Sequence, residues 1–144
     1  MSTTEAENRE LLVRFYEEVF NEGNLDVFDE LVAEDFANHN PIRPSVIIGA
    51  DEFREGVRMA RSAFPDLDIT IDDAIADGDK VVLRVTERGT HEETFMNIEP
   101  TGETVEVAGI HIYRVEDRQL AERWVQTDIV GLFQQLGVVE LPGQ

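Results

Sequence analysis

The chain has 144 residues and no cysteine, which excludes disulfides, thiolate nucleophiles and cysteine-based metal sites. It carries 31 acidic against 12 basic side chains, and the resulting formal net charge of −19 would repel nucleic acid and anionic membranes. No apolar run reaches the roughly 18 residues of a membrane span, and no secretory signal is recognisable. We expect one cytoplasmic domain over residues 1–144, with no nucleic-acid or membrane partner.

The acidic residues are dispersed along the chain rather than gathered in one block. This distribution argues against an acidic interaction tail, which needs a run of like charges. Lys80 is the only lysine, and the other basic residues are arginines. An even coat of carboxylates with almost no lysine is typical of a halophile's protein, so the charge indicates a habitat rather than a function.

Apolar residues at helical spacing predict three helices in the first part of the chain. The first ends at the segment Asn21–Asn24, and Asn24 is a candidate N-cap of the second. Turn-forming residues predict a loop at 38–45, and Pro65 ends the third helix. The three apolar stripes are Leu11, Leu12, Phe15, Tyr16, Val19 and Phe20; Leu25, Phe28, Leu31 and Val32; and Phe53, Val57, Ala60 and Phe64.

After Pro65 the pattern changes to alternating apolar and polar residues, which predicts half-buried strands. A short closing helix is expected from Asp128, a candidate N-cap, to Gly137. Helices followed by an antiparallel meander indicate the α+β class. The expected strands lie at residues 67–72, 83–86, 105–115 and around Trp124, with turns at 77–79, 99–103 and 116–118.

Residues 88–137 contain several short motifs in a fixed order. They are G-T-H, P-T-G, a strand that ends in an aromatic residue and an arginine, E-x-W and a closing Q-L-G. Together they resemble the SnoaL-like polyketide cyclases of the NTF2-like superfamily. The resemblance covers nearly the whole chain and implies a cone, in which a curved antiparallel sheet wraps against N-terminal helices. It also implies a cavity for a small apolar ligand and a homodimer.

The resemblance suggests a role for the imidazole at the centre of the strand 105–115. In such a fold the concave face of the sheet lines the cavity, and His111 and Tyr113 share the parity of that face. His91 has the parity of the apolar residues in its own strand and should also face inward. His39 matches a histidine near the cavity mouth of relatives. Because imidazole transfers protons near neutral pH, His111 is a candidate catalytic residue and the other three are candidate ligand contacts.

The alternative for His111 is a structural histidine whose ring is held by a buried protein group. If it serves a ligand, one ring nitrogen should have no protein partner. Replacing it by Leu should then leave stability nearly unchanged, since no buried partner loses its hydrogen bond.

The family's cyclases carry an aspartate as general acid and base directly after the tryptophan of the last strand. Here that position is Val125, which cannot transfer a proton. Asp128 is the remaining acidic candidate, either as a catalytic residue or as a helix cap. Arg123 shares the parity of Val125 and would favour an anionic or carbonyl-bearing ligand, unless it faces solvent or a dimer contact. Phe95 and Trp124 are candidate aromatic walls, or simply core.

Two functions therefore remain open. The first is a cofactor-independent acid–base enzyme, a cyclase or an isomerase, that acts on an apolar carbonyl-bearing molecule. The second is a non-catalytic binding dimer that has lost the cyclase acid. A carboxylate that reaches the cavity would favour the enzyme. No metal or cofactor is expected, because the histidines lack metal-ligand spacing and no phosphate-binding loop is present.

The face opposite His111 should also be apolar, because Ala108, Ile110 and Ile112 have the other parity of the same strand. An apolar face of a sheet is rarely left in water. We therefore expect it to form the homodimer interface.

The formal charge of −19 predicts that stability depends on salt. Repulsion among the carboxylates grows as screening is lost, so the melting temperature should fall when ionic strength is lowered from molar to millimolar. Thermal unfolding followed by circular dichroism measures this change. A melting temperature that does not depend on salt would contradict the halophile interpretation.

Overall fold

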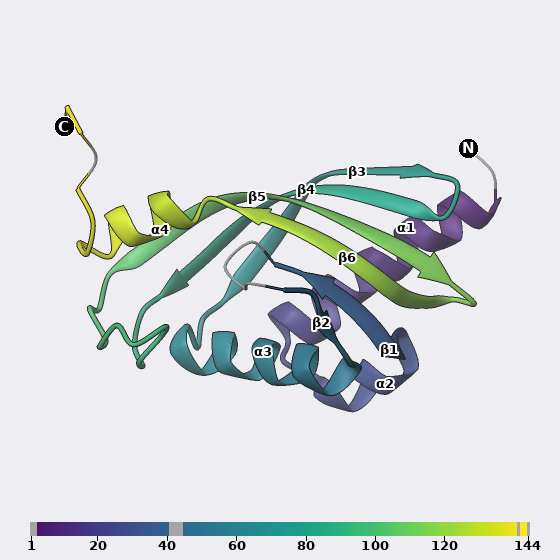
Figure 1. The fold of residues 1–144 in the computed structure, drawn as a ribbon, viewed down its shortest axis with the longest axis horizontal. Coiled ribbons are helices and arrows are strands. Elements are labelled where there is room, and N and C mark those ends of the chain that lie inside the picture. The colour runs from purple at the N-terminus through teal and green to yellow at the C-terminus, as the bar shows by residue number, and fades with distance from the viewer. Residues whose placement is uncertain (1–2, 41–44, 141, 144) are drawn as a thin grey trace.

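The computed structural model describes residues 3–40, 45–140 and 142–143 and contains a curved, open sheet of six strands (Figure 1). Helices lie against its concave side, so the α+β cone expected from the sequence is confirmed. The helices are α1 (Thr3–Phe15), the π-helical η1 (Tyr16–Asn21), the 3₁₀ turn η2 (Leu25–Val27), α2 (Phe28–Leu31), α3 (Ala50–Ala63) and α4 (Ile129–Gln135). The strands are β1 (Val32–His39), β2 (Ile47–Ile48), β3 (Asp68–Asp77), β4 (Lys80–Thr90), β5 (Thr104–Glu116) and β6 (Gln119–Thr127).

Helix boundaries follow local chemistry closely. The stripe of the first helix is buried as expected, with Leu12, Phe15 and Val19 inaccessible to solvent. Asn24 does act as an N-cap and accepts from the amide of Asp26, although the element it starts is the short η2. Helix α3 ends at Ala63, shortly before the proline, because a proline ring is incompatible with a continuing helix.

The sheet has the order β2-β1-β6-β5-β4-β3. Strands β3 to β6 form the expected antiparallel meander, whereas β1 pairs in parallel with β6. The sequence analysis missed β1, because it assigned Val32 to a helix and Asn38 to a loop. Strand β1 alternates poorly, and its parallel partner β6 lies far away in the chain, so no local pattern reveals it. The rest of that expected loop, at 41–44, lies outside the described residues.

Strand β5 lies between β4 and β6 and alternates without interruption between buried and more exposed positions. Its register aligns His111 with Leu83 on β4 and with Val125 on β6, so the three residues form one row across the concave face. The position at which the family's cyclases carry their aspartate is therefore next to His111. The buried positions of β5 are Val105, Val107, Gly109, His111, Tyr113 and Val115.

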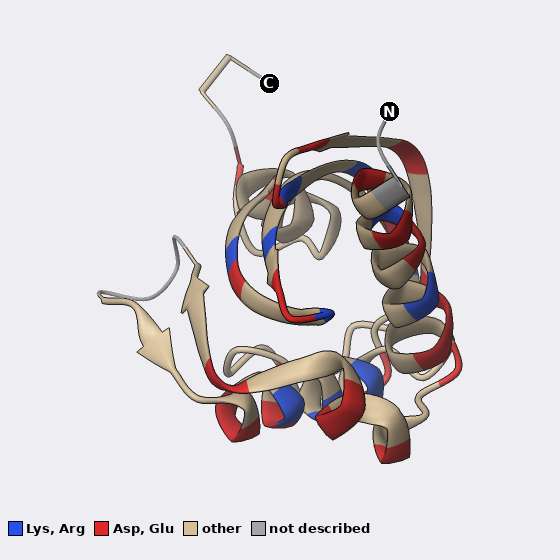
Figure 2. Ribbon diagram, turned by 90° about the vertical axis from the view of Figure 1, so that its right-hand side faces the viewer, with Lys and Arg blue, Asp and Glu red and all other residues tan. Residues whose placement is uncertain are grey.

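Two apolar clusters fill the concave side of the sheet. The larger packs α1, η1, α2 and α3 against the central strands, and the smaller joins the end of α3 to α4 and the start of β5. Aspartates and glutamates are spread over the outward faces of the helices and along the strands rather than in one block (Figure 2). The helices of the described part of the chain are too short or too polar to cross a membrane.

Candidate active site

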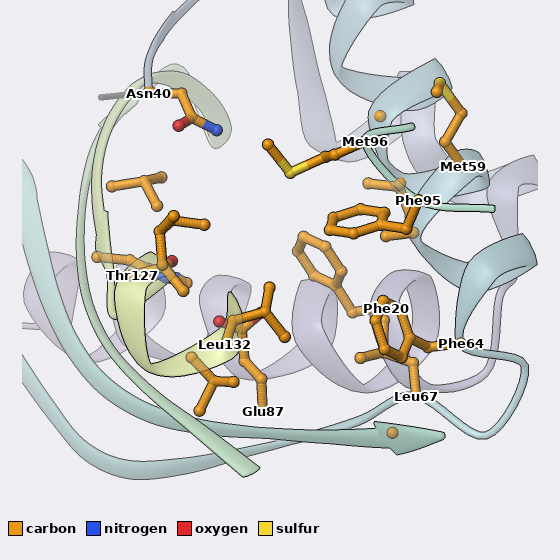
Figure 3. A pocket seen from close by; sticks show the side chains of 18 of the residues that line it. Phe20, Asn40, Met59, Phe64, Leu67, Glu87, Phe95, Met96, Thr127 and Leu132 are labelled. Atoms are coloured by element: carbon orange, nitrogen blue, oxygen red, sulfur yellow. The ribbon is translucent and has the colours of Figure 1, made fainter. Parts of the chain in front are cut away.

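A cavity of about 590 Å³ lies between the concave face of the sheet, α3, α4 and the loop that follows β4 (Figure 3). This volume is typical of small-molecule sites, which span about 300–1,000 Å³. Side chains from both apolar clusters form most of its wall, so it suits an apolar ligand. These are Phe20, Phe53, Val57, Phe64, Leu67, Phe95, Val105, Val107, Ile129 and Leu132, and Val125 of β6 adds a further apolar side chain.

A carboxylate stands on the sheet side of this cavity, that of Glu87 on β4 (Figure 3). Burial raises the pKa of Glu87 to about 7, and the positive charge of Arg123 limits the rise. No hydrogen bond or ion pair to another described residue holds the carboxylate. Near neutral pH, Glu87 is therefore present both with and without its proton and can accept or donate one.

The sequence analysis did not single out Glu87, although the signal was present. Leu83, Val85 and Glu87 have one parity on β4, and the first two face the core. The same alternation was used for His91 and, applied here, would have placed a glutamate on the concave face.

A chain of hydrogen bonds runs behind the cavity wall and ends at His111. Asn38 Oδ1 accepts from Arg123 Nε at 2.8 Å, and Arg123 Nη1 donates to the Tyr113 hydroxyl at 3.1 Å. That hydroxyl lies 2.8 Å from the hydroxyl of Tyr16, which lies 2.6 Å from His111 Nδ1. All five side chains are buried, and we call this chain the buried relay.

His111 forms part of the cavity wall, and its burial there favours the neutral form of the ring. Burial, with a smaller effect from the charge of Arg123, lowers the pKa of His111 to about 3. Burial also raises the pKa of Tyr16 well above its ordinary value. The sequence analysis made His111 a candidate because imidazole transfers protons near neutral pH, but a group with so low a pKa is a weak base there. Glu87 is better matched to that task.

Arg123 is held from several sides and contributes to the cavity wall. Its guanidinium lies over the ring of Phe53, 4.3 Å from the centroid, in addition to its bonds to Asn38 and Tyr113. Hydrogen bonds and an aromatic face offset part of the cost of burying a charge. The expectation that Arg123 faces the cavity agrees with this geometry.

His39 and Trp124, expected in the cavity, lie on the convex face of the sheet. Their rings stack 5.2 Å apart at an interplanar angle of 4°, and His39 Nε2 lies 2.7 Å from the carboxylate of Glu122. The alternation of β6 sends Arg123 and Val125 inward and therefore Trp124 outward. The parallel pairing of β1 sets His39 beside Trp124. Neither ring can contact a ligand in this cavity.

His91 is fully buried but does not contribute to the wall that the described residues form. Its Nδ1 accepts from the amide of Thr101 at 3.2 Å and lies 3.1 Å from the Thr101 hydroxyl, while its ring stacks on Phe64. The G-T-H and P-T-G motifs thus pack together. In this structure His91 supports the loop behind the aromatic wall.

Asp128 caps a helix, which agrees with the second of its two expected roles. It is exposed, and its carboxylate accepts from the amide of Gly131 at 2.9 Å at the start of α4. Phe95 belongs to the cavity wall, whereas Tyr113 lies one layer behind it in the relay. Within the described residues, no group of three or more His, Asp or Glu side chains is placed to hold a metal ion.

Comparison with known proteins agrees with the fold. The sequence profile of the SnoaL-like polyketide cyclases matches residues 10–136. The chain belongs to this family. A search of curated proteins gave no significant match.

Solved structures of similar proteins match over almost their full length. TsrD from Streptomyces laurentii is 29% identical, with 96% of this chain and 99% of that chain covered and a TM-score of 0.85. IdmH, a proposed polyketide cyclase from Streptomyces antibioticus, is 30% identical, with 91% and 99% covered and a TM-score of 0.78. A proposed polyketide cyclase from Acidithiobacillus ferrooxidans is 31% identical, with 95% and 98% covered and a TM-score of 0.79.

The relay revises the stability expected for His111→Leu. The sequence analysis expected almost no change, but Tyr16 has the imidazole as a hydrogen-bond partner. The substitution should cost about 1–3 kcal/mol, because a buried hydroxyl loses that partner. Urea titrations should show that the double variant loses less free energy of unfolding than His111→Leu and Tyr16→Phe lose in total as single variants.

Ile75→Ala is the matched control for this cycle, because Ile75 is 62% exposed and lies on edge strand β3. Its small effect should add to that of His111→Leu. Additive losses for His111 and Tyr16 would mean that their hydrogen bond does not contribute to stability.

Proposed function

We propose that this SnoaL-like protein is a cofactor-independent acid–base enzyme of the cyclase type. Its substrate is an apolar molecule with at least two carbonyl groups. The observation that carries the proposal is the carboxylate of Glu87, which stands in an apolar cavity with its pKa raised to about 7. The proposed activities of IdmH and of the Acidithiobacillus ferrooxidans protein support the reaction type.

Glu87 takes the part that an aspartate plays in the family's cyclases. Its carboxylate removes a proton from a carbon next to a carbonyl, and the electron pair of that C–H bond forms an enolate. The enolate carbon attacks a second carbonyl carbon of the same molecule and closes a ring. The alkoxide that results takes a proton back from Glu87, so the proton count balances. The charge of Arg123 favours the negative charge that develops on oxygen.

The non-catalytic binding protein remains the second candidate, and the observation that favours it is Val125. In the row that contains His111, Val125 replaces a group that could carry a proton. Glu87 favours the enzyme, because it puts a titratable carboxylate on the same concave face from another strand.

Glu87→Gln separates the two candidates, since glutamine keeps the size of the side chain and removes its titration. The wild-type protein should speed deuterium exchange at the methyl group of 2-acetylnaphthalene in D₂O, at a rate that rises as pH rises through about 7. The variant should exchange about 10²–10⁴-fold more slowly and lose that pH dependence. Proton NMR follows the methyl signal.

Glu106→Gln is the matched control, because Glu106 is exposed on β5, has the parity opposite to Val105 and Val107, and is not among the residues of the cavity wall. It should exchange like the wild type. If wild type and Glu87→Gln bind the ketone and exchange it equally slowly, the protein is a binding protein.

We also propose that the protein is a homodimer through the convex face of its sheet. Ile110 on β5 is 51% exposed, and Ile112 and Trp124 lie on the same face of neighbouring strands. A second copy offers the same apolar surface, so one two-fold contact would cover both.

Ile110→Arg should convert the dimer to a monomer, because a charge in an apolar contact has no partner there. Light scattering in high salt gives the mass directly. Met59→Arg, at a position 54% exposed on α3 on the other side of the sheet, should remain dimeric. A wild-type protein that is monomeric under these conditions would contradict the interface.

A further inference from the structure

We propose that His111 binds the carbonyl oxygen of the ligand, and that it does so by donating the hydrogen on Nε2. The buried relay fixes the ring in the form that can make this bond. The inference rests on the proposed function and adds the group that holds the oxygen while Glu87 moves the proton. His111 then selects for neutral carbonyl compounds and their enolates.

The direction of the relay follows from its only charged member. A guanidinium has hydrogen-bond donors and no acceptor, so the Tyr113 oxygen must accept from Arg123. The single hydrogen of Tyr113 then points to the Tyr16 oxygen, 2.8 Å away. Tyr16 is left to donate its own hydrogen to His111 Nδ1, at 2.6 Å. Because Nδ1 accepts, the proton of the neutral imidazole is on Nε2.

The opposite direction would leave one buried hydrogen without an acceptor. If Nδ1 carried the proton, it would donate to Tyr16, and Tyr16 would donate to Tyr113. The hydrogen of Tyr113 would then have no acceptor among its described partners, since Arg123 offers none. A buried donor without a partner is costly, so this arrangement is disfavoured. The low pKa of His111 agrees, because it excludes a ring with protons on both nitrogens near neutral pH.

The N–H donor at His111 Nε2 has no acceptor among the described residues. This nitrogen is buried and has no hydrogen-bond partner among the described residues, while the ring belongs to the cavity wall. His91 Nε2 is the other such atom, but its ring does not belong to that wall. An orphan donor beside an apolar cavity is satisfied when a ligand brings an acceptor.

Gly109 sets the direction in which the ring leans. A Cβ built at this position would lie 3.0 Å from His111 Nε2 and 3.4 Å from both a Val85 methyl carbon and the Gln126 carbonyl oxygen. The backbone of Gly109 is not in the left-handed region, so conformation does not demand glycine there. Glycine is needed for lack of space, because the imidazole of His111 covers the site that a side chain at position 109 would fill. Gly109 lies between His111 and Val107, and Val107 pairs with Glu87, so a ring that leans over Gly109 leans toward the carboxylate end of the cavity.

A matched pair of ligands tests the oxygen site without any need for catalysis. We expect 2-acetylnaphthalene to bind about tenfold more tightly than 2-ethylnaphthalene, which has the same carbon skeleton without the carbonyl oxygen. In His111→Leu the preference for the ketone should disappear. Gly109→Ala should weaken it, since the new methyl group crowds Nε2. Ile75→Ala, on the exposed edge strand, should keep it. Isothermal titration calorimetry gives each dissociation constant.

Nitrogen NMR of the wild-type protein tests the relay directly, even if a variant folds poorly. Long-range ¹H–¹⁵N spectra should show His111 as the neutral ring with its proton on Nε2, and that proton should shift when the ketone is added. Tyr16→Phe should give a mixture of both neutral forms. A proton on Nδ1 in the wild type, or an unchanged preference for the ketone in His111→Leu, would overturn the proposal. If Glu87 fails the exchange assay but the ketone preference holds, only the proposed catalysis is lost.

Discussion

The guanidinium of Arg123 is the group on which the rest of this site depends. It is a permanent charge in a buried position, and the fold supplies an amide oxygen, a phenol and an aromatic face to hold it. Because it can only donate, it orders the hydroxyls of Tyr113 and Tyr16 in one direction. Its charge also acts on Glu87 and His111 in the cavity wall, where it limits the rise in the pKa of Glu87 and adds to the fall in the pKa of His111.

One apolar environment therefore has opposite effects on two side chains. Burial disfavours the charged form of each, so it raises the pKa of a carboxyl and lowers that of an imidazole. Glu87 becomes a group that exchanges protons near neutral pH, and His111 becomes a neutral donor. With Glu87 as the proton-exchanging group and His111 as the neutral donor, a SnoaL-like cavity would keep acid–base chemistry although Val125 occupies the position of the family's aspartate.

The curvature of the sheet makes the cavity possible. The larger apolar cluster packs the first helices against the middle of the sheet, and the smaller one closes the end near α4. Side chains of both clusters line the space between them, where the concave faces of β4, β5 and β6 contribute Glu87, His111 and Arg123. Gly109 also shapes the cavity wall, because its lack of a side chain leaves room for the imidazole of His111.

Local patterns in the sequence were enough for the class of fold, the meander β3 to β6, the shared parity of His111 and Tyr113, and the capping role open to Asp128, whereas they left Arg123 open between the cavity and solvent. These features depend on parity, helical spacing and caps, which act over a few residues. The family motifs added the cavity, and the parity that placed His91 would also have found Glu87.

Long-range pairing determined what the sequence analysis could not supply. The parallel contact of β1 with β6 brings Asn38 to Arg123 and takes His39 to the convex face. In the sequence, Tyr16 was one of the residues of an apolar helical stripe. The fold brings its hydroxyl to His111 on β5, although the two residues are 95 positions apart in the chain. The charge states of Glu87 and His111 depend on how much water the packed chain removes around them. No stretch of sequence carries that information, because desolvation is a property of the assembled cavity.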